Sequence, residues 1–218
     1  AMTGTVEIPA GASNAPITIT TVEDDLLETS ETIEITLLPG EGYAMRFGQY
    51  ASLNIVDNEI AIGQTPYRDI PIRLSATVEA EDFNHGPANV AYKDVSPGNS
   101  GNAYRNGGVD IEPAIDIRGG FAITHTRAGE WLNYSVDVPV SGTYRIETRV
   151  ASPTKGGTFQ LEFNGSNKTG AITLPTTGSF STWKSLTKTG VKLNAGVQTM
   201  TLRINRAFVS GQVVGAFN

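Results

Sequence analysis

The sequence contains no cysteine. A disulfide framework, a zinc site with cysteine ligands and thiol catalysis are therefore excluded, whereas the compartment stays open because many exported bacterial proteins also lack cysteine. No apolar run approaches the roughly 18 residues that a membrane-spanning helix needs. The Ala1-Met2 start is typical of a cloning remnant rather than a signal peptide, so we expect a piece of a longer protein.

Basic residues are in the minority, with 16 Lys and Arg against 22 Asp and Glu and a net charge of −6. A chain with this balance has no basic field with which to hold phosphate groups. It accommodates cations and neutral ligands more readily. We therefore expect no nucleic-acid partner and no membrane partner.

Runs of helix-forming residues at helical spacing are almost absent. The sequence has instead 24 glycines and 11 prolines, and 39% of its residues are hydrophobic, as in ordinary folded proteins. Short strands joined by turns account for this composition. The composition predicts an all-β protein.

The clearest strand pattern covers residues 131–138. Every second residue from Leu132 to Val138 is apolar, which is the period of a strand with one buried face, and Trp131 opens this strand. A turn leads into residues 143–150, which alternate in the same way, so we expect an antiparallel hairpin. Further strands are expected at residues 158–163, 170–174, 183–189 and 197–204.

Residues 1–59 have the pattern of a small β unit, with strands expected at residues 4–11, 17–20, 32–37 and 51–57. Carboxylates are concentrated in residues 23–31 and again in residues 57–59. Calcium takes six to eight oxygen ligands, so two acidic loops can hold such an ion. The alternative is a solvated acidic loop that keeps strand edges from pairing.

This unit resembles the C-terminal half of a Calx-beta repeat, through residues 4–11, 24–31 and 55–59. The resemblance implies that calcium is held by acids of the two loops, namely Asp24, Glu28, Glu31 and Asp57. Since half a sandwich leaves an apolar face uncovered, we expect the unit to pack on the second domain, to pack on another copy, or to be partly mobile.

Residues 60–74 contain glycine and prolines without a clear period, which predicts a linker before a second domain of residues 75–218. The first strand expected there, residues 76–83, places Glu79 and Glu81 on one face. Two neighbouring carboxylates repel unless a positive group lies between them, so a cation or an arginine is indicated, and we favour calcium. The acid pair of a glycosidase would instead flank a cleft.

Residues 86–120 are rich in Gly, Asn and Asp and show no strand pattern. A passage of this length without regular structure is usually functional. Tyr92 offers ring surface there. Oxygen-bearing side chains can order the passage around a second ion, and they are Asp94, Asn99, Asn102, Asp110 and Glu112. The alternative is a packed Ω-loop whose polar groups satisfy its own backbone.

The second domain is similar to a family 6 carbohydrate-binding module over residues 76–218. The motifs that carry the resemblance, in family order, include Glu79-Ala80-Glu81, Tyr92-Lys93-Asp94, Gly98-Asn99-Ser100-Gly101, Val109-Asp110-Ile111-Glu112, Gly129-Glu130-Trp131 and Ser179-Phe180-Ser181-Thr182-Trp183. The resemblance implies a jelly-roll β-sandwich with structural calcium. It also implies binding of plant or algal polysaccharides and attachment to secreted glycoside hydrolases.

Sugar rings have C–H faces that stack on aromatic rings, and hydroxyl groups that bond to amides or carboxylates. The resemblance implies that two aromatic rings on loops hold one sugar, at positions that fall on His125 and Phe180. An amide bonds the hydroxyl groups, at Asn218 or, as second choice, at Gln212. Larger rings are usual at both ring positions, which implies weaker binding or a different sugar.

Two tryptophans and the last residues complete the pattern. Trp131 and Trp183 lie in alternating strands, so we expect core packing for both rather than contact with sugar. Arg127, next to the first ring position, can meet an anionic or sulfated glycan. Residues 205–214 form a longer stretch than in the family, and a final strand is expected to continue past Asn218.

We expect a non-catalytic module that anchors a secreted glycoside hydrolase, its tethered catalytic domain, to a β-linked polysaccharide. Agarose-type galactan and β-1,3-glucan are favoured. Catalysis by the chain itself has little support, because its 2 histidines give no Ser/His/Asp arrangement. The other alternative is calcium-dependent adhesion at the cell surface without glycan binding. Either way, the protein is expected to be secreted or at the cell surface.

Overall fold

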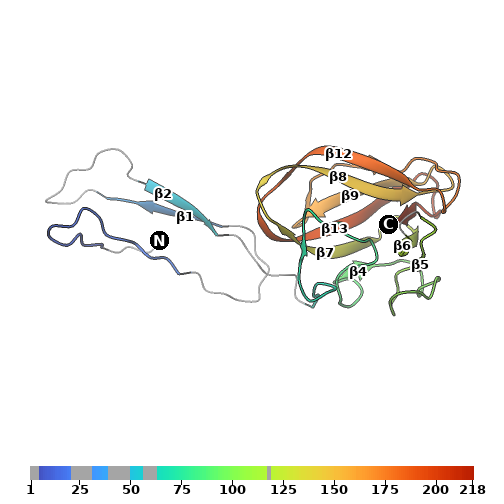
Figure 1. Cartoon of the computed structure of the whole chain (residues 1–218), viewed down its shortest axis with the longest axis horizontal. Helices are drawn as coiled ribbons and strands as arrows, with labels where there is room; N and C mark the ends of the chain where they lie inside the picture. Colours follow the sequence, from blue (N-terminus) through green and yellow to red (C-terminus); the bar gives the residue numbers. More distant parts are fainter. Residues whose placement is uncertain (1–4, 21–30, 39–49, 56–62, 117–118) are drawn as a thin grey trace. The chain divides into compact units, whose positions relative to one another are not determined.

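The computed structural model describes residues 5–20, 31–38, 50–55, 63–116 and 119–218. These residues form two compact units, one within residues 5–55 and one within residues 63–218. All regular elements in the described ranges are strands, which confirms the predicted all-β class (Figure 1).

The first unit contains β1 (Glu31–Thr36) and β2 (Tyr50–Ile55), which pair antiparallel. The strands expected at residues 4–11 and 17–20 are wrong for the described residues, because residues 5–20 pair with no neighbouring strand. Their β-branched side chains stay exposed, Ile8 at 56% and Ile17 at 54%. Such exposed apolar side chains are what half a sandwich predicts.

The acidic loops of the first unit fall mostly outside the described residues. Of the predicted calcium ligands, Asp24, Glu28 and Asp57 lie in the ranges that are not described. Glu31 begins β1, where its backbone pairs with Ile55. The Calx-beta-like calcium site therefore stays a prediction.

The second unit is a sandwich of two sheets. One has the order β10-β9-β13-β7-β3, with β11 on β9 and β4 on β7, and its strands are β3 (Ile72–Arg73), β4 (Tyr92–Lys93), β7 (Trp131–Val138), β9 (Gly157–Phe163), β10 (Ser166–Asn167), β11 (Ile172–Thr173) and β13 (Gly196–Ala207). The other has the order β12-β8-β14-β6-β5, and its strands are β5 (Ile111–Pro113), β6 (Phe121–Thr126), β8 (Gly142–Ala151), β12 (Lys184–Leu193) and β14 (Gly215–Phe217).

The strands expected at residues 131–138 and 143–150 are present as β7 and β8. The prediction that they pair with each other as a hairpin is wrong. β7 pairs with β13 and β8 pairs with β12, so the two strands lie in opposite sheets. Tyr134 and Val136 of β7 share one buried core with Val150 of β8. Alternation of apolar residues shows that one face of a strand is buried. It does not show whether the next strand lies in the same sheet or in the opposite sheet of a sandwich.

Residues 63–74, expected as a linker, are packed in the second unit. β3 pairs parallel with β7, and Gln64 is buried, with its Oε1 accepting hydrogen bonds from Asn84 Nδ2 (3.0 Å) and Asn133 Nδ2 (3.3 Å). Because residues 63–74 cover the outer face of β7, its outer residues Asn133 and Ser135 are buried as well as its core residues. The polar half of the β7 pattern therefore meets a packed layer rather than water.

The strand expected at residues 76–83 does not form, because the segment makes no ladder with any described strand. Among the described strands, β8 also lacks a second neighbour over most of its length. It pairs with β12 along one edge, whereas β14 meets its other edge only at Val150 and Ala151, with one further bond from Asn218 N to Arg149 O. Residues 74–81 and β8 line opposite walls of one cleft.

Candidate functional site

The two predicted ring positions lie together at one end of the sandwich. The ring centroids of His125 and Phe180 are 6.0 Å apart, with their planes tilted by 42°. This separation is within the range of interacting aromatic pairs, so the two rings form one nonpolar surface. The His125 side chain is 38% exposed and that of Phe180 is half-buried, which leaves ring surface open to a ligand.

Local backbone geometry holds His125 in this position. It lies near the end of β6 with φ of 52°, a left-handed conformation that is uncommon outside glycine. Thr124 Oγ1 lies within hydrogen-bond distance of His125 Nδ1, at 3.0 Å. Such strained positions persist where the surrounding structure fixes them, and they are concentrated at binding sites.

The loop that carries Phe180 is braced against the end of β8. Thr177 N donates to Ser152 O (2.7 Å), and Ser152 N donates back to Thr177 Oγ1 (2.9 Å). Farther along the loop, the hydroxyl of Ser179 lies 2.9 Å from that of Thr182. The loop therefore fixes Phe180 without help from a ligand.

Glu112 adds a carboxylate to the ring pair. Its Oε1 lies 3.8 Å from His125 Nδ1, and its side chain is 41% exposed. An exposed carboxylate beside two rings can accept hydrogen bonds from sugar hydroxyl groups. The sequence indicated Glu112 only as an oxygen-bearing loop residue, because the pairing of β5 with β6 that brings it to His125 cannot be read from the chain.

The second-choice amide, Gln212, lies in an exposed turn that the structure ties to β6. Arg127 Nη1 donates to Gly211 O (2.6 Å), and Val214 N donates to Thr126 O (2.6 Å). These bonds bring the turn to the end of the strand that carries His125. A sugar contact of Gln212 stays a prediction.

Asn218 and Tyr92 have other partners. Asn218 Nδ2 donates to Asp116 Oδ2 (3.3 Å), and its backbone N donates to Arg149 O (3.1 Å). Tyr92 packs edge-on against Phe83, with 5.5 Å between the ring centroids. None of the hydrogen bonds and ring contacts described for these two residues reaches the ring pair, and their sugar contacts stay predictions.

The core packing expected for the tryptophans is wrong. Trp131 and Trp183 are both half-buried and neither belongs to the buried core of the described residues. Trp183 Nε1 donates to Ile115 O (3.1 Å). Each lies at or just before the start of its strand, where the sandwich opens toward its loops, so alternation alone overstated their burial.

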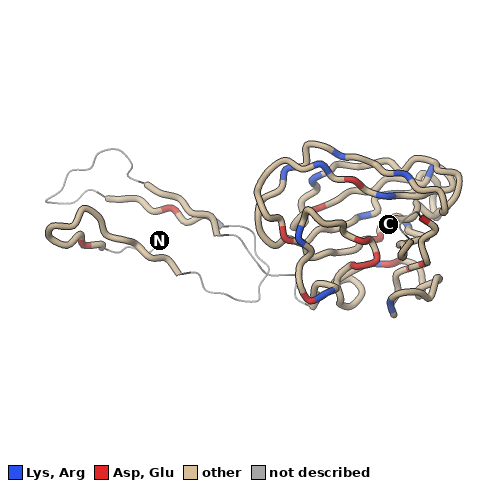
Figure 2. The backbone as a smooth tube through the Cα atoms, viewed as in Figure 1, with Lys and Arg blue, Asp and Glu red and all other residues tan. Residues whose placement is uncertain are grey.

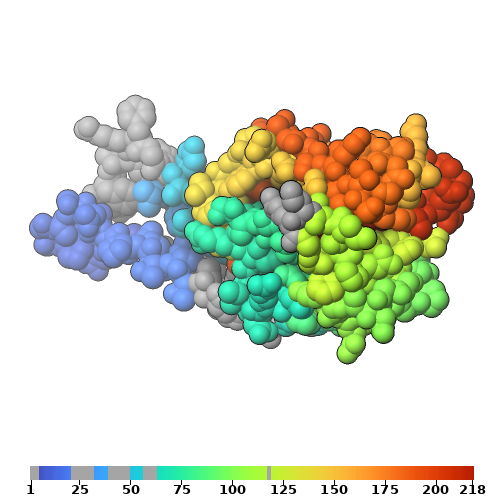
Figure 3. All heavy atoms as spheres, turned by 45° about the vertical axis from the view of Figure 1, so that its right-hand side comes forward, coloured from blue at the N-terminus to red at the C-terminus, as the bar shows by residue number. Residues whose placement is uncertain are grey.

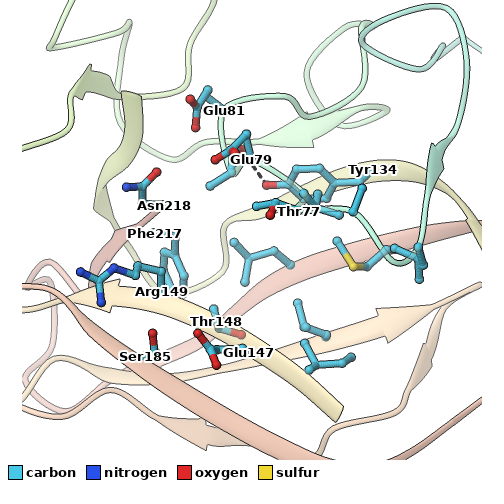
Figure 4. A pocket seen from close by; sticks show the side chains of 18 of the residues that line it. Thr77, Glu79, Glu81, Tyr134, Glu147, Thr148, Arg149, Ser185, Phe217 and Asn218 are labelled. Atoms are coloured by element: carbon cyan, nitrogen blue, oxygen red, sulfur yellow. Dashed lines mark hydrogen bonds between the residues drawn. The ribbon is translucent and has the colours of Figure 1, made fainter. Parts of the chain in front are cut away.

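A cleft of about 1180 Å³ opens between the two sheets (Figure 4). One wall carries Glu79 and Glu81, and Figure 4 shows Glu147 and Arg149 of β8 on the opposite side. Glu81 Oε1 accepts a bond from Phe121 N (3.3 Å), whereas its Oε2 is buried without a hydrogen-bond partner. Burial, together with the nearby Glu79 charge, raises the pKa of Glu81 to about 7.

The carboxylates of Glu79 and Glu81 fit a hard cation such as calcium, which takes oxygen ligands. The buried Glu81 Oε2 has no hydrogen-bond partner and is available as one of these ligands. The two carboxylates do not make a complete site. Nowhere in the described ranges do three or more His, Asp and Glu residues gather in a way that could hold a metal. Backbone oxygens or water would have to supply the remaining ligands.

The passage at residues 86–116 is ordered by its own polar side chains and forms part of the surface of the second unit (Figure 3). Asp110 Oδ1 accepts a bond from Ser100 N (2.7 Å), and Asp94 Oδ1 accepts one from Ser96 N (2.7 Å). Asn99 Oδ1 accepts one from Ile111 N (3.0 Å). These contacts match the Ω-loop alternative, and the second ion at Asp94, Asn99 and Asp110 stays a prediction.

Glu130 links this passage to the loop after β6. Its Oε1 accepts a bond from Val95 N (3.3 Å) and its Oε2 one from Arg127 N (2.7 Å). Burial raises the pKa of Glu130 to about 7, and the charges of Asp94 and Asp110 add to the effect.

The raised pKa of Glu130 predicts a pH dependence of stability. The folded state binds the proton more tightly than the unfolded state, whose pKa is 4.5. The contribution of Glu130 is therefore fully present below pH 4.5 and is lost as the pH rises through about 7. We expect the free energy of unfolding in urea to fall between pH 5.5 and pH 8, by roughly 1–2 kcal/mol from this residue. Glu130→Gln should reduce that slope, and an unchanged slope would contradict the assignment.

Comparison with known proteins identifies the family. The model of the carbohydrate binding module (family 6) matches residues 100–209, which span the ring pair, Glu112 and most of both sheets. The chain belongs to this family. As a family 6 module it is a carbohydrate-binding domain and not a catalytic one, and the predicted jelly-roll sandwich is confirmed. No helix long and apolar enough to cross a membrane occurs among the residues that the structure describes.

Two curated relatives share part of this sequence. The clotting factor G alpha subunit of Tachypleus tridentatus is 36% identical over 101 residues, which cover 45% of this chain and 15% of the relative. Beta-agarase AgaA of Microbulbifer thermotolerans is 32% identical over 71 residues, which cover 32% of this chain and 16% of the enzyme. The chain thus matches only a small part of each relative's length.

A solved structure shows the same fold. The β-1,3-glucan binding family 6 module from Bacillus halodurans has a TM-score of 0.52 and 20% sequence identity, over 68% of this chain and 96% of that module. At this identity the likeness concerns the fold alone.

Proposed function

We propose that this family 6 module anchors a secreted multidomain glycoside hydrolase to a β-linked polysaccharide, with agarose-type galactan or β-1,3-glucan as the favoured ligand. The contact between His125 and Phe180 carries the proposal, because it places two rings and the Glu112 carboxylate where one sugar can meet all three. The name of one relative, a β-agarase, supports the choice of agarose-type galactan.

Binding would act through effective concentration. A tethered catalytic domain that is held beside an insoluble or gel-forming polymer meets its substrate far more often than one in free solution. Attachment to a hydrolase and export from the cell belong to this proposal. Adhesion without glycan binding is not favoured, because the family is one that binds carbohydrate.

Affinity electrophoresis of the intact chain tests the proposal. Gels that contain agarose, β-1,3-glucan, xylan or soluble cellulose are compared with a gel without polymer, and a non-binding protein of similar size corrects for sieving. Retardation by agarose or β-1,3-glucan supports the proposal. Equal migration in all gels would reject it.

Structural calcium at Glu79 and Glu81 belongs to the same proposal. The partnerless Glu81 Oε2 supports it. We expect added calcium to raise the thermal unfolding midpoint of the chain, and we expect Glu81→Gln to abolish that shift, because binding to the folded state alone stabilises it. If added calcium still raises the unfolding midpoint of Glu81→Gln, the ion binds at another site, for example at the Calx-beta-like acidic loops.

The free edge of β8 supports the expected continuation of the last strand. β14 runs antiparallel to β8, and the bond from Asn218 N to Arg149 O extends their pairing by one step. A strand that followed in the same direction would pair with the remaining edge of β8. It would also cover the cleft, whose walls include the core residues Tyr134 and Phe163.

A further inference from the structure

A cluster of positive side chains surrounds Phe208, just after β13. The Lys155 ammonium lies 5.1 Å from the centroid of the Phe208 ring, and the Arg206 guanidinium carbon lies 5.0 Å from it. Both are cation–π distances. The two charges are therefore separated by no more than about one Debye length at 0.1 M salt, roughly 10 Å. Lys155 and Arg206 are exposed to solvent.

Arg127 adds a third cation at the same end of the sandwich. Its Nη1 donates to Gly211 O, in the turn that follows Phe208, and it stands two residues after His125. Phe208 N donates to Gly156 O (3.0 Å), which holds the turn against the loop that carries Lys155. The longer stretch at residues 205–214 thus carries Arg206 and also contacts Arg127 and the loop of Lys155. We call Arg127, Lys155 and Arg206 the cationic rim.

Carboxylates do not neutralise the cationic rim. None of the ion pairs in the described ranges includes its three residues, whereas the neighbouring Arg203 is paired with Glu162 at 2.8 Å. Glu130, next in space to Arg127, is buried, and both of its oxygens accept backbone N–H bonds. Across the second unit, many Asp and Glu residues lie around β4 and its loops instead (Figure 2).

Lys155 and Arg206 lie close together around one ring, and the repulsion between two like charges is unfavourable without a counter-charge. A bound anion adds an attraction that offsets the repulsion between the cations. Arginine presents N–H donors in a fixed fork that fits planar or tetrahedral oxyanions, and Arg127 uses only part of its fork on Gly211.

We propose that the galactan or glucan held by this module is bound more tightly where it carries a sulfate or carboxylate substituent, and that the cationic rim binds this substituent. The proposal rests on the function proposed above. The ring pair stacks on one sugar and Glu112 accepts its hydroxyl groups, while the rim takes the charged substituent of the same chain. The net negative charge of the protein then repels anionic polymers except at this end.

Affinity electrophoresis with matched polymers tests the proposal on the intact chain. Neutral agarose is compared with a sulfated galactan and with a uronic-acid polymer, each at about 20 mM and about 500 mM NaCl. The test variant is Arg127→Gln, Lys155→Gln, Arg206→Gln. The control variant is Arg145→Gln, Lys188→Gln, Lys192→Gln, which removes the same charge from exposed positions on β8 and β12.

We expect the sulfated or the carboxylated polymer to bind at least about tenfold more tightly than agarose at low salt, and to lose that advantage at high salt. The rim variant should lose this preference for the charged polymer even at low salt, while the control variant should keep it. The polymer that shows the advantage identifies the substituent. Equal losses in the two variants, or equal affinity for neutral and charged polymers, would overturn the inference.

The outcomes separate this inference from the proposed function. Retention by neutral polymers alone leaves the function intact and overturns only the anionic ligand. No retention by any polymer overturns both. Thermal unfolding of each variant is measured in parallel, and a rim variant that unfolds like the control shows that the lost binding is not a loss of fold.

Discussion

Replacing His125 and Phe180 together by alanine should remove retention on the polysaccharide that the module binds. The two rings form one nonpolar surface, with 6.0 Å between their centroids. Each ring that stacks on a sugar face is worth roughly 1.5 kcal/mol, so losing both lowers affinity by about 100-fold. Affinity electrophoresis on the best-retained polymer measures the change. Each single variant should lose about tenfold.

Two further variants make this result specific. His85→Ala removes the other histidine, which is exposed and packs on Tyr67 instead, and it should leave retention unchanged. Phe180→Trp enlarges one ring and should tighten binding. If the double alanine variant is retained like the unmodified chain, the ring pair is not the binding site, and the cleft between the two sheets becomes the next candidate.

The strands of the second unit could be predicted from the sequence because their alternation is strong. β7 begins at Trp131 as predicted, and β13 and β9 lie where residues 197–204 and 158–163 indicated. What failed was the choice of neighbours. Alternation records one buried face, so it could not show that β7 and β8 face each other across the core. It also could not show that residues 76–83 form no ladder with any strand that the structure describes.

The candidate site could be predicted only in part. The family resemblance placed the two ring positions, and the structure brings His125 and Phe180 into contact. Glu112 and the cationic rim were not found as a set, because they depend on strand register and on loop packing between residues far apart in the chain. Arg127 was noted from its place beside His125, whereas nothing in the sequence tied Lys155 to Phe208.

Replacing Arg105 by lysine should destabilise the second unit severely, although the charge is kept. The guanidinium donates from Nη1 to Glu81 O (3.2 Å) and also to Phe83 O, and from Nη2 to Asn84 O (3.2 Å). It lies 3.8 Å from the Phe83 ring centroid, and burial lowers the pKa of Arg105. A lysine ammonium is a compact point charge that cannot reach three carbonyls along the chain and stack on a ring.

We expect Arg105→Lys to lower the free energy of unfolding by about 2–4 kcal/mol, because buried carbonyls lose charged donors. Arg68→Lys is the matched control. Its side chain is 71% exposed and pairs with Asp82, so the change should cost much less stability than Arg105→Lys. Urea unfolding compares the two. Since Arg105 fixes the segment that carries Glu81, its variant should also lose the calcium shift. Equal costs at both positions would mean that packing on β7, rather than Arg105, holds this segment against the sandwich.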